Sequence, residues 1–138
     1  DGEPDEDGQR GSVHLLEWPS VPGVVVETAK WTQLRALRDQ VNEAIEPLRR
    51  DKTIRSSLEA EVVVPAAAVP EGVSDAALAE LFITATVTRG QGEAVIVTKT
   101  NHHKCGRCWR HLPDVADDAS LCGRCEDTVA QIDASAAA

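Results

Sequence analysis

The spacing of apolar residues changes along the chain and predicts elements of different kinds. Between residues 31 and 48 the apolar positions recur at steps of three and four, which is typical of one face of an amphipathic helix. These positions are Trp31, Leu34, Leu37, Val41, Ala44, Ile45 and Leu48. We expect Thr28 to cap this helix. Pro47 predicts a kink or an early break before a last turn through Lys52, because proline lacks the N–H of the helical hydrogen bond.

Shorter patterns follow the long helix and predict a small sheet. Residues 60–64 read as a buried strand that Pro65 ends, and Ser74 is expected to cap a short helix through about Glu80. Residues 82–88 alternate apolar side chains with threonine, and residues 93–99 form another strand-like segment after a Gly-containing turn. A short turn between two strands predicts an antiparallel hairpin.

All four cysteines occur in two C-x-x-C knuckles, Cys105–Cys108 and Cys122–Cys125. Two thiolate pairs at such a separation can close one tetrahedral metal site, as in structural zinc ribbons. The sequence therefore predicts one structural Zn²⁺ ion, held by Cys105, Cys108, Cys122 and Cys125. Iron in place of zinc would have the same spacing and would favour a redox ribbon instead.

These patterns together predict an α+β fold, in which an amphipathic helix with a small antiparallel sheet is followed by a four-cysteine zinc-ribbon module. Residues 1–11, with five acids, read as an acidic linker or loop, and residues 12–100 hold the helix and sheet. The zinc finger is expected at 101–129, and a disordered tail at 130–138. Because the chain contains no Met, we expect a piece of a longer polypeptide.

The overall charge and hydropathy limit the partners of the chain. A net charge of −9 argues against nonspecific attraction of the whole chain to nucleic acid. No apolar run approaches the roughly 20 residues that a membrane span needs, so we expect no membrane partner. Paired C-x-x-C units without other cysteines favour the reducing cytosol, and we expect a cytoplasmic monomer.

A basic island surrounds the first knuckle of this acidic chain. No acid occurs between Glu93 and Asp114, whereas the island holds Lys99, Lys104, Arg107 and Arg110, with Trp109 among them. One interpretation is that these bases offset the formal charge of −2 on a four-thiolate site. The other is that Lys104, Arg107, Trp109 and Arg110 form a platform for phosphate and an unstacked RNA base.

Two further alternatives concern the aromatic and imidazole groups of this region. Trp109 can stand free as a stacking platform, or it can pack over the metal site as the small core of the module. His102, His103 and His111 are expected to be surface groups rather than ligands, because four cysteines already suffice. No constellation of catalytic residues is apparent.

The order of the motifs resembles the C-terminal region of bacterial isoleucyl-tRNA synthetases. The resemblance runs from Ser12-Val13-His14-Leu15 through the helix and 54–60 to Cys105-x-Arg107-Cys108-Trp109 and Leu121-Cys122-x-Arg124-Cys125. It implies an anticodon-binding region with a structural zinc, in an enzyme that activates isoleucine with ATP and charges its tRNA. The tRNA(Ile) anticodon arm and the remainder of the same polypeptide would be the partners.

By this resemblance, Arg107, Trp109 and Arg110 would lie near the anticodon arm. The catalytic domain would lie outside the chain, so that this piece alone would catalyse nothing. The knuckle also resembles the zinc finger of formamidopyrimidine-DNA glycosylases, which leaves a DNA-repair finger as one alternative. A zinc ribbon that binds another protein is a further alternative.

Overall fold

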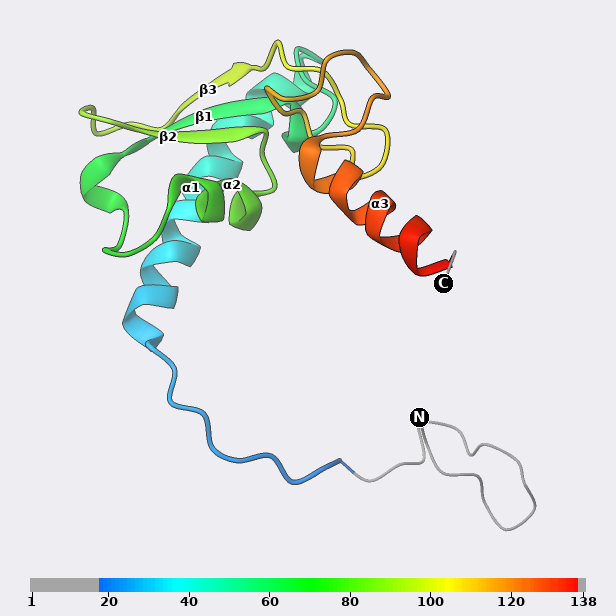
Figure 1. Ribbon diagram of the computed structural model, residues 1–138. Coiled ribbons are helices and arrows are strands. Elements are labelled where there is room, and N and C mark those ends of the chain that lie inside the picture. Colours follow the sequence, from blue (N-terminus) through cyan, green and yellow to red (C-terminus); the bar gives the residue numbers. More distant parts are fainter. Residues whose placement is uncertain (1–17, 137–138) are drawn as a thin grey trace.

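The computed structural model describes residues 18–136 and contains three α-helices and three strands within this range (Figure 1). The predicted acidic linker of residues 1–11 and the first residues of the predicted helix-and-sheet part, 12–17, lie outside the described residues. The elements, in chain order with two short 3₁₀ turns omitted, are α1 (Thr28–Arg50), β1 (Ala60–Pro65), α2 (Asp75–Phe82), β2 (Thr86–Gly90), β3 (Ile96–Lys99) and α3 (Gly123–Ala136).

Helix α1 buries the stripe that its sequence predicts. Leu34, Leu37, Val41 and Ile45 are buried, whereas Trp31 at the start of the stripe remains 46% exposed. Thr28 is the first helical residue, and the cap position before it is Glu27. The helix continues through Pro47 and ends at Arg50, so the expected break is wrong. A proline three residues from a helix end removes only one bond near a terminus that frays in any case.

The sheet is mixed and has the order β2-β1-β3. Strand β1 pairs in parallel with β2 and antiparallel with β3, and β2 and β3 do not pair with each other. The predicted hairpin, and with it a purely antiparallel sheet, is therefore wrong, although the α+β class is confirmed. Strand β1 needs neighbours on both edges because Val62 and Val64 are fully buried in the centre of the sheet.

Helix α2 replaces the beginning of the predicted second strand. Ser74 caps it as expected, with its hydroxyl accepting a 3.1 Å hydrogen bond from the backbone N–H of Ala77. Phe82, which the alternation assigned to a strand, ends the helix, and Ile83 caps it in the left-handed conformation (φ 59°). The strand then begins only at Thr86. Helices α1 and α2 pack on the same face of the sheet (Figure 1).

The described chain has two apolar clusters. The larger one joins α1, α2 and the sheet, and the smaller one surrounds the cysteines with Val115. Helix α3 leaves the small cluster and reaches Ala136, so the prediction of a disordered tail is wrong for residues 130–136. Its alanine-rich end has a high helical propensity, which a reading for apolar periodicity misses. No helix among residues 18–136 combines the length and apolar character needed to span a bilayer.

Candidate metal centre

The four cysteine sulfur atoms lie within 4.8 Å of one another, and the cysteines are free thiols rather than disulfides. The Sγ atoms of Cys108 and Cys122 are 3.9 Å apart. A tetrahedral site with Zn–S bonds of about 2.3 Å has sulfur–sulfur edges of about 3.8 Å. Among the described residues this is the one cluster of metal-binding side chains, and its donor set and spacing fit Zn²⁺.

The first knuckle is a tight turn that is held on both sides by backbone hydrogen bonds. The N–H of Cys105 donates to the carbonyl of Arg110 (2.9 Å), and the N–H of Trp109 donates back to the carbonyl of Cys105 (3.0 Å). Gly106 lies against the loop before the second knuckle, and a Cβ at this position would sit 2.4 Å from the carbonyl oxygen of Ala119. The glycine is required by this close approach of two backbones.

The second knuckle leads directly into α3, with Cys125 in the first turn of the helix. The glycine of this knuckle donates its N–H to the carboxylate of Asp114 (2.9 Å), and Gly106 donates to the carbonyl of Ser120 (3.0 Å). The N–H groups of the two glycines are therefore occupied by oxygen acceptors and not by sulfur. The N–H of Cys122, in contrast, donates to the sulfur of Cys105 at 3.4 Å.

The surroundings of the cysteines shift the pKa values of two of the thiols in opposite directions. Burial acts to raise the pKa of Cys105, but backbone N–H groups of Cys108, Arg107 and Cys122 donate to its sulfur and lower the pKa to about 6. Burial is also the main cause that raises the pKa of Cys122, to about 12, and neighbouring thiols add to the rise. Four adjacent thiols cannot all ionise without a positive charge among them. A divalent cation supplies that charge and deprotonates the thiols that bind it.

The four predicted RNA-binding residues occupy three different environments. Trp109 is 62% exposed, so it does not form the core of the module, and its backbone is left-handed (φ 65°). The ammonium group of Lys104 lies 5.3 Å from the centre of the Trp109 ring. Arg107 lies against the metal site, with Nη1 3.9 Å from the sulfur of Cys125. Arg110 instead points to α2, where Nη1 is 3.2 Å from a carboxylate oxygen of Glu80.

The two interpretations of the basic island therefore apply to different residues. Arg107 is placed to offset the negative charge of the thiolates. Lys104 and Trp109 form an exposed cation–aromatic pair, which we call the finger platform. Arg110 joins the finger to the helix-and-sheet part, and Arg124 approaches the same Glu80 oxygen at 3.8 Å.

The histidines of the island make contacts outside the sulfur cluster. His111 Nδ1 is 2.8 Å from the carbonyl oxygen of His102, and His103 lies 3.3 Å from the carboxylate of Asp118. His103 is exposed, as a surface group would be, whereas His102 and His111 are half-buried. The same Asp118 oxygen accepts a 3.0 Å hydrogen bond from the N–H of Lys104, which brings an acid back onto the island from the loop between the knuckles.

Sequence reasoning missed three carboxylates that support this centre, namely Glu80, Asp114 and Asp118. Asp114 and Asp118 stand between the knuckles, where acids commonly cap turns, and that signal was available. Glu80 lies far away in sequence on the exposed side of α2, and no local pattern connects it with the finger.

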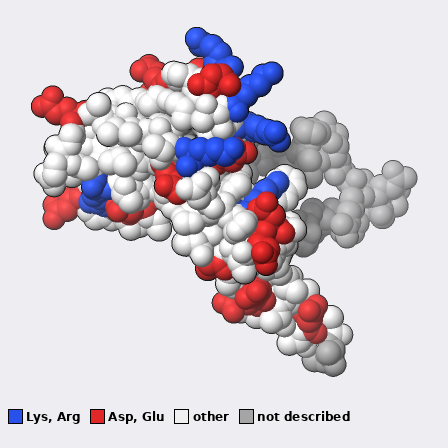
Figure 2. Space-filling view, turned by 90° about the horizontal axis from the view of Figure 1, so that it is seen from above, with Lys and Arg blue, Asp and Glu red and all other residues white. Residues whose placement is uncertain are grey.

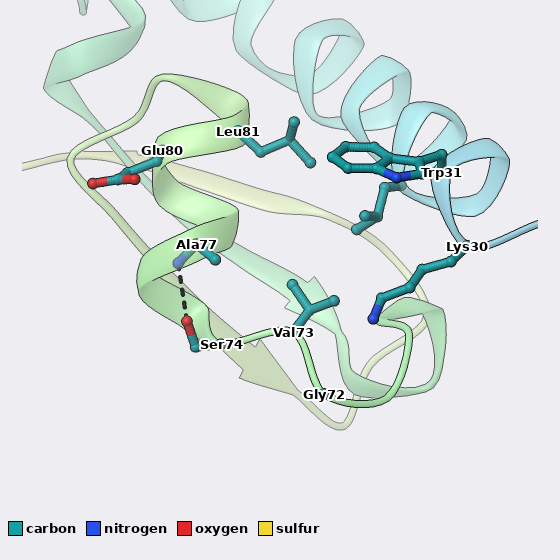
Figure 3. Close-up of a pocket in the computed structure, with 9 residues that line it drawn as sticks. Lys30, Trp31, Gly72, Val73, Ser74, Ala77, Glu80 and Leu81 are labelled. Atoms are coloured by element: carbon teal, nitrogen blue, oxygen red, sulfur yellow. Dashed lines mark hydrogen bonds between the residues drawn. The ribbon is translucent and has the colours of Figure 1, made fainter. Parts of the chain in front are cut away.

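The described surface also has an apolar groove of about 470 Å³ between α1 and α2 (Figure 3). Trp31, Leu34, Val73 and Leu81 supply its apolar wall, and Lys30 lies at one end. It holds no group of nucleophiles or metal ligands among its lining residues. The chemistry of the chain is concentrated in the finger.

The four clustered cysteines on two knuckles have the geometry of a four-cysteine zinc finger, and comparison with known proteins shows which kind of finger this is. Residues 103–128 match the family described as "Zinc finger found in FPG and IleRS". This match and the donor set agree on a zinc-binding module.

Relatives extend the similarity to most of the chain. It is 46% identical to isoleucine–tRNA ligase of Zymomonas mobilis over 127 residues, which cover 88% of this chain and 14% of the relative. It is 40% identical to isoleucine–tRNA ligase 2 of Burkholderia mallei, over 89% of this chain and 14% of the relative. An isoleucine–tRNA ligase of Neisseria meningitidis is 35% identical, over 88% of this chain and 14% of the relative.

The chain thus spans about one seventh of the length of the curated relatives it matches. The resemblance seen in the sequence is confirmed: the chain corresponds to the C-terminal, zinc-finger region of isoleucyl-tRNA synthetases.

Proposed function

We propose that this chain is the zinc-containing, tRNA-binding module of an isoleucine–tRNA ligase. The full enzyme would activate isoleucine with ATP and charge tRNA(Ile), with its catalytic domain in the remainder of the polypeptide. This module would hold the anticodon arm, in the cytoplasm, as part of a monomer. One Zn²⁺ bound to Cys105, Cys108, Cys122 and Cys125 would fix the shape of the finger, and the finger itself would perform no chemical step.

The observation that carries the proposal is the exposed indole of Trp109. A left-handed backbone at a non-glycine residue costs free energy, and such strain persists where the surrounding structure imposes it. Here the knuckle imposes it and turns a large apolar ring toward solvent, directly after a metal ligand. An exposed ring with an ammonium group beside it offers a base a stacking surface and offers the attached phosphate a positive charge.

The charge of the chain favours a local contact over general attraction. The chain as a whole is acidic, so a polyanion is repelled except where cations gather. The finger platform presents Lys104 and Trp109 on such a cationic part of the surface, and Arg107 lies two residues before the ring. A single-stranded loop, with bases free to turn outward, suits this arrangement better than a duplex does.

Replacement of Trp109 tests the proposal. Loss of one stacked base costs about 1–3 kcal/mol, so Trp109→Ala should weaken binding of an RNA hairpin with the anticodon-arm sequence about 5- to 150-fold. Fluorescence anisotropy with labelled hairpin measures the affinity. Trp18→Ala is a matched control, because Trp18 is 96% exposed and lies ten residues before α1.

Three outcomes would contradict the proposal. Equal affinities for Trp109→Ala and the unchanged chain would remove the platform from RNA binding. Tighter binding to duplex DNA than to the hairpin would favour a repair finger. Metal analysis that found iron, or no metal, would contradict the structural zinc.

A further inference from the structure

The second concentration of positive charge in the described chain lies at the end of α1, away from the cysteines. Arg49, Arg50, Lys52 and Arg55, which we call the α1-end surface, are all exposed. They line a hollow of about 390 Å³ together with Glu46 and the buried Ile54. Residues 46–55 hold four bases against the two acids Glu46 and Asp51, a net charge of +2 in a chain of −9.

The acids of this segment are largely engaged, which leaves the bases free. Glu46 lies 3.8 Å from Arg49, and the Asp51 carboxylate accepts a 2.9 Å hydrogen bond from the N–H of Thr53. Within the described part of the chain, the side-chain nitrogens of Arg50, Lys52 and Arg55 form no ion pair with a carboxylate within 4.0 Å. Exposed cations that line one hollow without counter-charges raise the local positive potential, which favours an anionic partner.

Stabilisation of the helix end explains only part of this arrangement. The negative end of the helix dipole favours cations within the last turn, where Arg49 and Arg50 stand. Lys52 and Arg55 lie beyond that turn, and Lys52 adopts a left-handed backbone (φ 64°) that carries the chain around the hollow. Buried Ile54 anchors this turn to the core, so the bases stand on a fixed backbone.

The same surface connects to the finger through Glu59. The backbone N–H of Arg55 donates to a carboxylate oxygen of Glu59 (3.3 Å), and Lys99 approaches that oxygen at 3.8 Å. Lys99 ends β3, directly before the finger. In Figure 2, Lys and Arg side chains concentrate on the upper and central part of the face seen from above, and acids line α3.

We infer that the α1-end surface binds the phosphodiester backbone of RNA, as a second contact beside the finger platform. This inference rests on the proposed function for the identity of the polyanion. Three of the four bases are arginine, whose planar fork matches phosphate oxygens with two parallel hydrogen bonds. The surface lacks an exposed aromatic ring, so it holds the backbone and leaves the reading of bases to the finger.

The test compares two double variants with the same change of charge. Arg50→Gln/Arg55→Gln removes two cations from the surface, and Arg35→Gln/Arg38→Gln removes two exposed cations from the middle of the same helix. Binding of the anticodon-arm hairpin to the full zinc-loaded chain is measured by anisotropy between about 50 and 200 mM salt. Each lost phosphate contact lowers the slope of log K against log salt by about 0.7–0.9, so we expect the first variant to lose about 1.4–1.8.

Raising the salt from about 50 to 200 mM weakens RNA binding of the unchanged chain by some factor. For the first variant we expect that factor to be about 7- to 12-fold smaller. The control variant should keep the slope. Equal slopes for both variants, or a lower thermal stability of the first variant without a change in slope, would overturn the inference. A lower thermal stability alone would identify the bases as stabilisers of the helix end. Preferential binding to an acidic protein surface would contradict RNA as the ligand.

The outcomes also separate this inference from the proposed function. If Trp109→Ala weakens RNA binding and Arg50→Gln/Arg55→Gln does not, the finger platform stands and the α1-end surface is refuted. If the reverse holds, the finger platform is refuted and the α1-end surface stands. A chain that binds no hairpin at the lowest salt refutes both.

Discussion

The two glycines of the repeated knuckle should respond to alanine in opposite ways. A Cβ on Gly106 would sit 2.4 Å from the carbonyl oxygen of Ala119, whereas real Cβ contacts essentially never fall below 3.0 Å. A Cβ on Gly123 would meet its nearest neighbour, a carboxylate oxygen of Asp114, at an ordinary contact distance of 3.5 Å. The same substitution is therefore a clash in one knuckle and a normal contact in the other.

The free-energy cost of Gly106→Ala follows from the two backbone segments that the new Cβ would push apart. Two 3.0 Å hydrogen bonds hold the facing backbones together, from Gly106 to Ser120 and from Ala119 to Lys104. Their separation forfeits about 0.5–1.5 kcal/mol for each bond, so Gly106→Ala should cost about 1–3 kcal/mol. Gly123→Ala should be neutral or stabilising by up to about 1 kcal/mol, because alanine favours the helix that begins there.

Zinc competition with a chromophoric chelator measures both variants. Because the finger closes around the metal, the cost of Gly106→Ala should appear as a zinc affinity about 5- to 150-fold weaker. Gly123→Ala serves as the matched control at the corresponding position. Equal affinities for the two variants would refute the argument, since they would show that the two backbones separate freely.

Two further predictions concern the metal and the loop between the knuckles. Chelation of zinc should unfold the chain after Asn101 and leave the helix-and-sheet signals, as amide NMR spectra would show; loss of both together would contradict the separate apolar clusters. The pKa of Asp118 is lowered by the hydrogen bonds from the Lys104 N–H and the His103 ring. Its ionised form therefore stabilises the fold above the ordinary value of about 3.9, and this contribution is lost as the pH falls through the lowered pKa. The difference in unfolding free energy between Asp118→Asn and the unchanged chain should shrink over that range, and a constant difference would refute the reasoning.

Features that depend on the spacing of nearby residues were predicted from the sequence better than the pairing of strands. The metal ligands, the buried face of α1 and the Ser74 cap each depend on spacing within a few residues, and each was predictable. The strand order was not, because a short turn between 82–88 and 93–99 suggested a hairpin. The continuous apolar run of β1, followed by a helix and then β2, was the available signal of a parallel pair around a central strand.

The sequence could not predict that the bases of the basic island have different roles, and the reason is a different one. Arg107 and Arg110 are three residues apart, yet Arg107 faces the sulfur of Cys125 and Arg110 faces a carboxylate on α2. The turn of the knuckle between them sets these directions. Only the positions of Cys125 and Glu80 in space distinguish a base that offsets charge from one that joins two parts of the chain.

The shared carboxylate of Glu80 has a thermodynamic consequence. It receives Arg110 from the first knuckle and Arg124 from the second, so a metal that holds the two knuckles side by side would favour both ion pairs together. Zinc affinity and the stability of α2 are therefore linked, and linkage acts equally in both directions. Exposed ion pairs contribute about 0–1 kcal/mol, so the effect on zinc affinity stays within about fivefold. Glu80 also lines the apolar groove between α1 and α2, with its carboxylate directed away from Trp31 and Lys30 (Figure 3), so a molecule that packs in the groove would be coupled to the finger through helix α2.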